Sequence, residues 1–119
     1  MSKIIAIIAG EPNSISSEII FKSWIKREKF SHKPFVIIGS IKLLNLQRKK
    51  LKFNIKIKKV DSNLNLKNIK QNEMPVYNVD YQQQNPFEKV SIKTNKYIYS
   101  CFAVAIRLLK NKKILGLIN

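Results

Sequence analysis

The residues from Lys3 to Phe21, KIIAIIAGEPNSISSEIIF, constrain the fold of this chain more than any other stretch. Residues 4–9 are a short apolar run rich in β-branched side chains, bounded by Gly10, which is typical of a buried strand. A Gly-Glu-Pro turn follows, and then an apolar pattern with helical spacing. The stretch predicts a strand, a tight loop and a helix. In open α/β folds that loop lies at the carboxyl edge of the sheet, where ligands bind.

Strand-like and helix-like patterns alternate along the rest of the chain. Four further strands are expected at residues 35–38, 53–60, 74–79 and 114–118. Helices are expected at residues 15–25, after Ser40, and at 90–110. This order predicts an α/β fold with three layers, a mostly parallel sheet flanked by helices.

The helical spacing also predicts which side chains face the core. In the first helix these are Ile15, Ile19, Ile20, Phe21, Trp24 and Ile25. In the last helix they are Ile92, Tyr97, Cys101, Val104, Ala105 and Leu108. Candidate caps for the first helix are Asn13, Ser14, Ser16 and Ser17. The final strand, residues 114–118, is expected to be buried.

Length and composition favour one globular domain. The chain has 119 residues, of which 45% are hydrophobic, enough for one core. Its longest apolar runs are too short to cross a bilayer, and no secretory signal is evident. Cys101 is the only cysteine, so the chain forms no internal disulfide. We expect a cytoplasmic protein without a membrane partner.

The charge is strongly basic, with 23 Lys and Arg against 7 Asp and Glu and a formal net charge of +16. Such a balance attracts nucleic acid and phosphorylated ligands. An alternative explanation is compositional, because a chain dominated by Lys, Ile and Asn is typical of an AT-rich coding sequence. Tyr97, Tyr99 and Phe102 follow helical spacing and do not form a base-stacking motif. Nucleic acid therefore stays open as a partner on charge alone.

The loop Gly10-Glu11-Pro12 is the candidate ligand-binding site. Gly10 permits a positive φ and a close backbone approach, while Pro12 restricts Glu11 to an extended conformation. A carboxylate at this edge can meet a hydroxyl, a ribose or a cation. Backbone N–H groups at the start of the following helix can hold an anion. The alternative is an ordinary strand–helix turn with a solvated Glu11.

Other chemical motifs are missing from the sequence. Gly10 is not part of a G-x-G-x-x-G fingerprint, and no Walker A sequence is present. His32 is the only histidine and lacks neighbours at metal-ligand spacing, so we expect no metal site. Cys101 has no base to activate it and is expected in the core. The run Arg48-Lys49-Lys50 is either a solvated helix end or a phosphate contact. No residue is assigned a catalytic role.

The sequence resembles the amino terminus of the 4-hydroxythreonine-4-phosphate dehydrogenase family of vitamin B6 biosynthesis. That family opens with a strand followed by Gly-Asp/Glu-Pro-Ala-Gly-Ile-Gly-Pro-Glu and an apolar helix. The matching residues here are Gly10, Glu11, Pro12, Ile15, Glu18 and Ile19. Residues 94–105 and 114–119 also resemble the family's helix and strand that precede a Thr-x-Pro-x-x-Lys loop.

The resemblance implies a fold shared with isocitrate and isopropylmalate dehydrogenases, and an NAD-dependent oxidation and decarboxylation of a phosphorylated hydroxy amino acid. It also implies a homodimer, a divalent metal, and contact of Gly10, Glu11 and Pro12 with cofactor or substrate. The family's metal-binding histidines lie in a part of the enzyme beyond Asn119, so no metal ligand is carried over. We therefore expect residues 1–119 to be one amino-terminal α/β segment of a larger dehydrogenase, truncated after Asn119 and inactive alone.

Two alternatives to this interpretation stay open. In the first, the chain is a basic α/β module that binds RNA or another polyanion. In the second, it is a degenerate relative of the family without enzymatic activity. The first depends on the charge. The second depends on Asn13, Ser14, Ser16 and Ser17, which stand where the family has Ala, Gly, Gly and Pro. The choice between NAD and NADP and the exact substrate also stay open.

Overall fold

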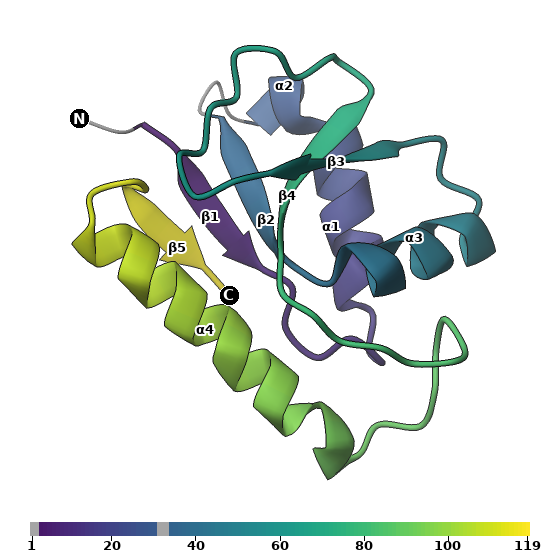
Figure 1. The fold of residues 1–119 in the computed structure, drawn as a ribbon. Coiled ribbons are helices and arrows are strands. Elements are labelled where there is room, and N and C mark those ends of the chain that lie inside the picture. Colours follow the sequence, from purple (N-terminus) through teal and green to yellow (C-terminus); the bar gives the residue numbers. More distant parts are fainter. Residues whose placement is uncertain (1–2, 31–33) are drawn as a thin grey trace.

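The structure is a computed structural model and describes residues 3–30 and 34–119. Within these residues one parallel sheet has the strand order β3-β4-β2-β1-β5 (Figure 1). The strands are β1 (Ile5–Ile8), β2 (Phe35–Gly39), β3 (Lys56–Val60), β4 (Glu73–Asn78) and β5 (Gly116–Ile118). The helices are α1 (Ser16–Ile25), α2 (Arg27–Phe30), α3 (Ile41–Lys50), the 3-10 turn η1 (Ile92–Thr94) and α4 (Asn95–Lys110).

Helices cover both faces of the sheet. Successive side chains of a strand point to opposite faces, so one strand packs against the helices of both layers. Val36 and Ile38 of β2 pack in the cluster that includes Tyr97 and Cys101 of α4. Ile37 packs on the other face, in the cluster that includes Phe21 of α1. In Figure 1, α4 lies in front of the sheet and α1 behind it. The expected three-layer α/β architecture is confirmed, and the described sheet is entirely parallel.

The register brings the carboxyl ends of the central strands to one edge. Ile8 of β1 is paired with Ile38 of β2, and Gly39 is paired with Asn78 of β4. The segments that follow these strands therefore lie side by side, although they are about 30 to 70 residues apart in the sequence. The Gly10-Glu11-Pro12 loop leaves the sheet at this edge.

The expectation of a buried final strand is wrong. β5 begins at Gly116 and forms one border of the sheet, so Leu115 is exposed and Ile118 is 55% exposed. Ile15, Ile19 and Ile25 of the first helical segment are exposed as well, contrary to the expected broad buried face. The cause is tertiary: α1 packs with only Ser17, Ile20, Phe21 and Trp24 buried.

The predicted start of the last helix and the predicted cap of the first are also wrong. The last long helix begins at Asn95, since Ser91 has extended backbone and residues 92–94 form a 3-10 turn. Ile92 is consequently 84% exposed instead of facing the core. At the first helix the cap position is Ile15, which makes no side-chain capping bond. The nearby Ser14 hydroxyl instead accepts a hydrogen bond from the Ser16 backbone N–H at 3.2 Å.

Candidate functional site at the carboxyl edge of the sheet

The loop after β1 has the backbone conformation that its glycine predicts. Gly10 has φ +71°, and a β-carbon at this position would have only the Ser16 side chain within 4 Å. A side chain here would be strained by the positive φ rather than by crowding. The backbone at Gly10 is therefore open to close approach by a ligand.

The carboxylate of Glu11 is held in one orientation and is not freely solvated. The hydroxyl of Thr94 lies 3.0 Å and 3.1 Å from its two oxygens, and its single hydrogen is shared between them. Thr94 is buried at the end of η1, 83 residues from Glu11 in the sequence. A charged acceptor makes this bond stronger than a bond between neutral groups. No sequence motif marks Thr94 as a site residue, because its partner is so distant along the chain.

Two amide side chains connect the loop to residues 81–88. Asn13 and Gln83 exchange two hydrogen bonds, of 3.1 Å and 2.7 Å, through their side-chain amides. The Asn13 carbonyl oxygen also accepts from the Glu88 backbone N–H at 3.0 Å. The family resemblance places an alanine at position 13. Asn13 therefore gives this chain a connection between loops that an alanine cannot form.

Gln47 joins the same two segments. Its Nε2 donates to the Pro12 carbonyl at 2.7 Å and to the Pro86 carbonyl at 2.9 Å. The side chain is only 1% exposed, so both of its amide hydrogens are used in a buried setting. The sequence pattern does not reveal Gln47 as a site residue. In the sequence Gln47 stands beside Arg48, Lys49 and Lys50, and nothing in this polar run indicates that the glutamine is buried and the others are not.

The carboxyl end of β2 holds a second group of polar contacts. The Tyr97 hydroxyl accepts from the Ser40 N–H at 2.8 Å, and the Ser40 hydroxyl caps α3 by accepting from the Leu43 N–H. The Tyr97 ring stacks on Tyr81, with ring centroids 4.8 Å apart. Burial raises the pKa of the Tyr97 hydroxyl well above its usual value, so the group stays neutral. It is a structural hydrogen-bond partner rather than a proton donor for chemistry.

Gly39 is required for this arrangement. A β-carbon at position 39 would lie 2.9 Å from the Ala9 side chain and 3.0 Å from the Tyr97 hydroxyl. Both distances are shorter than ordinary contact allows. The glycine therefore lets α4 approach the carboxyl end of β2, and it sets where Tyr97 lies.

An apolar hollow of about 350 Å³ lies beside Gly10. It is bordered by β1, by the exposed flank of α1 at Ile19 and Ser23, and by Ile118 and Asn119 at the end of β5. Ile19 is 51% exposed and Ile118 is 55% exposed. The candidate loop thus borders a surface that is partly apolar and uncovered.

The remaining candidates from the sequence take structural roles or fall outside the description. Cys101 is fully buried, and burial raises the pKa of its thiol to about 11, which disfavours a nucleophilic thiolate. Arg48 donates to Asn45 at 2.9 Å within α3. His32 lies outside the described residues. Ser17, at the start of α1, has a buried hydroxyl that finds no hydrogen-bond partner among the described residues.

The described part of the chain shows neither a metal cluster nor a membrane-spanning helix. No group of three or more His, Cys, Asp or Glu side chains in residues 3–30 and 34–119 is placed to hold a metal ion. No helix in those same ranges is long and apolar enough to cross a membrane.

Two solved structures have a fold similar to that of this chain. A 4-hydroxythreonine-4-phosphate dehydrogenase from Burkholderia phymatum superposes with a TM-score of 0.81 at 18% identity, covering 99% of this chain. A protein from Salmonella typhimurium assigned to the same activity gives a TM-score of 0.79 at 22% identity over 98% of this chain. This chain has the fold of those dehydrogenases.

The match extends over only part of the neighbours. This chain spans 37% of the first structure and 36% of the second, and it corresponds to an amino-terminal portion. The predicted resemblance and the α/β fold class are thereby confirmed. No protein-family model and no curated protein sequence matches the chain.

Proposed function

We propose that this chain is the amino-terminal part of a dehydrogenase that oxidises a small phosphorylated hydroxy acid with NAD. The observation that carries the proposal is the fold likeness, a TM-score of 0.81 over 99% of the chain, to an enzyme named 4-hydroxythreonine-4-phosphate dehydrogenase. The Gly-Glu-Pro loop supports it, since this loop lies at the carboxyl edge of a parallel sheet. The corresponding reaction is oxidation and decarboxylation of a phosphorylated hydroxy amino acid.

The loop residues suit contact with a nicotinamide cofactor or its substrate. Gly10 leaves its backbone open on the side of the apolar hollow, and Glu11 is a carboxylate of fixed orientation. A bound NAD supplies the hydride acceptor. The role of this chain is to border that group: Gly10 allows close approach, Glu11 accepts from a hydroxyl, and Pro12 is buried and keeps the turn rigid.

The divalent metal of the resembled family does not fit this chain. No cluster of metal-ligating side chains exists among the described residues, and the Glu11 carboxylate already accepts from Thr94. Any such metal would be held by residues outside this chain. We therefore expect residues 1–119 alone to bind ligand weakly and to lack dehydrogenase activity.

The uncovered apolar surface is where the rest of the enzyme would pack. Ile19 and Ile118 are both more than half exposed beside the hollow. Burying them would stabilise an assembled enzyme by about 1 to 2 kcal/mol for each side chain. Assembly as a cytoplasmic homodimer is part of the same proposal.

Ligand titration of the isotope-labelled chain by NMR tests the proposal. Added NAD is expected to shift the amide signals of Gly10, Glu11 and Asn13, which flank or form the loop; Pro12 has no amide N–H. Gly10→Ala should abolish these shifts, because alanine is strained at φ +71°. Gly116→Ala is the matched control, as no atom lies within 4 Å of a β-carbon at position 116. NAD shifts confined to other segments, or equal loss in both variants, would contradict the proposal and favour a non-enzymatic relative.

A further inference from the structure

A concentration of positive charge on α3 and β3 is not used by the proposed dehydrogenase function. Residues 42–60 contain eight Lys and Arg residues and no Asp or Glu. Half of the net charge of +16 therefore comes from 19 consecutive residues. They form one helix and one border strand of the sheet, which lie next to each other (Figure 1).

Part of this charge lines a groove. One hollow of about 570 Å³ lies between α3 and the glutamines at 82–84, and a second of about 430 Å³ lies at the ends of β2, β3 and β4. The two hollows share Lys42, Asn45 and Gln82 in their lining, so they lie next to each other. Lys49 extends the lining at one end and Lys59 at the other. We call this feature the α3 groove.

The lining has the chemistry of a phosphodiester backbone site. Lys42, Lys49 and Lys59 are exposed and form no ion pair among the described residues. Asp80 is the one acid among the described residues that line the two hollows, and it accepts from Asn78 at 2.9 Å. The rest of the lining is rich in side-chain amides, which bind ribose hydroxyls and base edges.

The hydrogen bonds at the start of α3 argue against a site for one compact phosphate. The Ile41 N–H is taken by Asn78, the Leu43 N–H by the Ser40 hydroxyl, and the Ser40 N–H by Tyr97. These helix-start amides are therefore not free to bind an anion. Recognition is left to lysines spaced along the groove, an arrangement that suits an extended chain of phosphates.

The lysines of β3 have a second explanation that does not extend to the groove. Charged residues on a border strand prevent unwanted pairing with other chains, and Lys56 and Lys58 can serve this purpose. Lys42 and Lys49 lie on a helix, where that purpose is absent.

We propose that the α3 groove binds single-stranded nucleic acid through its sugar-phosphate backbone, without sequence preference. Contacts to about three phosphates at the three lysines imply a slope of about −2 for log affinity against log salt concentration.

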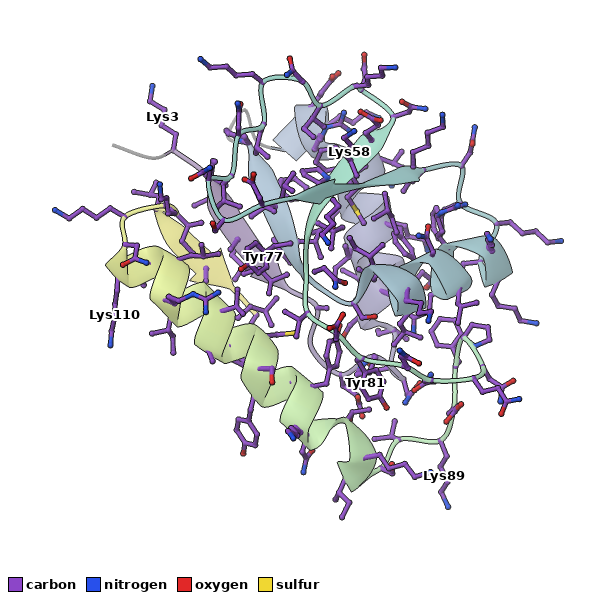
Figure 2. The ribbon with its side chains drawn as sticks, in the orientation of Figure 1. Lys3, Lys58, Tyr77, Tyr81, Lys89 and Lys110 are labelled. Atoms are coloured by element: carbon purple, nitrogen blue, oxygen red, sulfur yellow. The ribbon has the colours of Figure 1, made fainter. Side chains whose placement is uncertain are left out.

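The test is fluorescence anisotropy with a labelled 20-nucleotide oligouridine at 50 mM salt. The variant Lys42→Gln/Lys49→Gln/Lys59→Gln is expected to bind about 100-fold more weakly than wild type and to lose most of the salt slope. The control Lys96→Gln/Lys110→Gln/Lys113→Gln removes equal charge around α4, and Lys110 projects from the far end of that helix (Figure 2). It is expected to bind within about 3-fold of wild type.

Several results would overturn the proposal. These are no binding by wild type at 50 mM salt, equal loss in both triple variants, or full displacement of the oligouridine by millimolar NAD, which would make the groove a nucleotide site of the dehydrogenase. Should the groove variant fail to fold, photocrosslinking of wild type with 4-thiouridine RNA decides: crosslinks must map to residues 42–49 or 82–84. Gly10→Ala, which tests the dehydrogenase proposal, should leave RNA binding unchanged.

Discussion

Gln47 offers the sharpest test of how the candidate loop is held in place. Replacement by methionine keeps the volume and the unbranched shape of the side chain but removes both N–H donors. The Pro12 carbonyl would lose the donor that now lies at 2.7 Å, whereas the Pro86 carbonyl would lose the donor at 2.9 Å but keep Gln83 Nε2 at 3.3 Å. An unsatisfied buried acceptor costs about 1 to 3 kcal/mol. Pro12 is buried, and Pro86 is partly exposed and can recruit water.

We therefore expect Gln47→Met to lower the free energy of unfolding by about 3 kcal/mol, with most of the loss from Pro12. Urea denaturation followed by circular dichroism measures it. With a slope of about 1.5 kcal/mol per molar, the midpoint should fall by about 2 M. Gln82→Met is the control, because Gln82 is exposed, and it should change stability by less than about 0.5 kcal/mol. A loss below about 1 kcal/mol for Gln47→Met would refute the reasoning.

Three further predictions concern the same edge of the sheet and the core beneath it. Gly39→Ala should cost about 1 to 3 kcal/mol in urea denaturation through overpacking, whereas Gly116→Ala should be nearly neutral; equal effects would count against the close approach. Thr94→Val removes the donor to Glu11 and should cost about 1.5 kcal/mol, with Thr94→Ser restoring most of it; unchanged stability in the valine variant would argue that the bond contributes nothing. Burial raises the pKa of the Cys101 thiol from 9.0 to about 11, so the folded protein keeps a proton that the unfolded chain loses. Wild-type stability should therefore fall more steeply than that of Cys101→Ala between about pH 9 and 11, and parallel pH profiles would show the inference to be mistaken.

The strands and the main helices are predictable from the sequence because their periodicity is local. Residues 4–9 and 35–38 are apolar runs next to glycines, and Tyr97, Cys101, Ala105 and Leu108 follow helical spacing; all four are buried in α4 as expected. Gly10 was also predictable, since a glycine between a strand and a Glu-Pro turn favours positive φ, which it adopts. The contact of Gly10, Glu11 and Pro12 with a cofactor or substrate stays a prediction.

The apolar residues that remain exposed are not predictable in the same way. Ile19 and Phe21 look equivalent in the helical pattern, yet Ile19 is half exposed and Phe21 is fully buried. Their difference depends on which neighbours lie over α1, and these neighbours come from distant segments. Ile92 differs from its prediction for another reason: the helix begins only after the extended backbone at Ser91 and a 3-10 turn, although the apolar spacing starts earlier.

The sequence by itself determined the alternation of strands and helices, the glycine-containing loop and the basic segment at residues 42–60, because each is encoded in adjacent residues. Only the tertiary structure decided that Thr94 would orient Glu11, that Gln47 would join Pro12 to Pro86, and that three lysines would line one groove. The hydrogen bonds among these contacts join residues 35 to 83 positions apart. They form because a parallel sheet brings the ends of its strands together at one edge, whatever their separation along the chain.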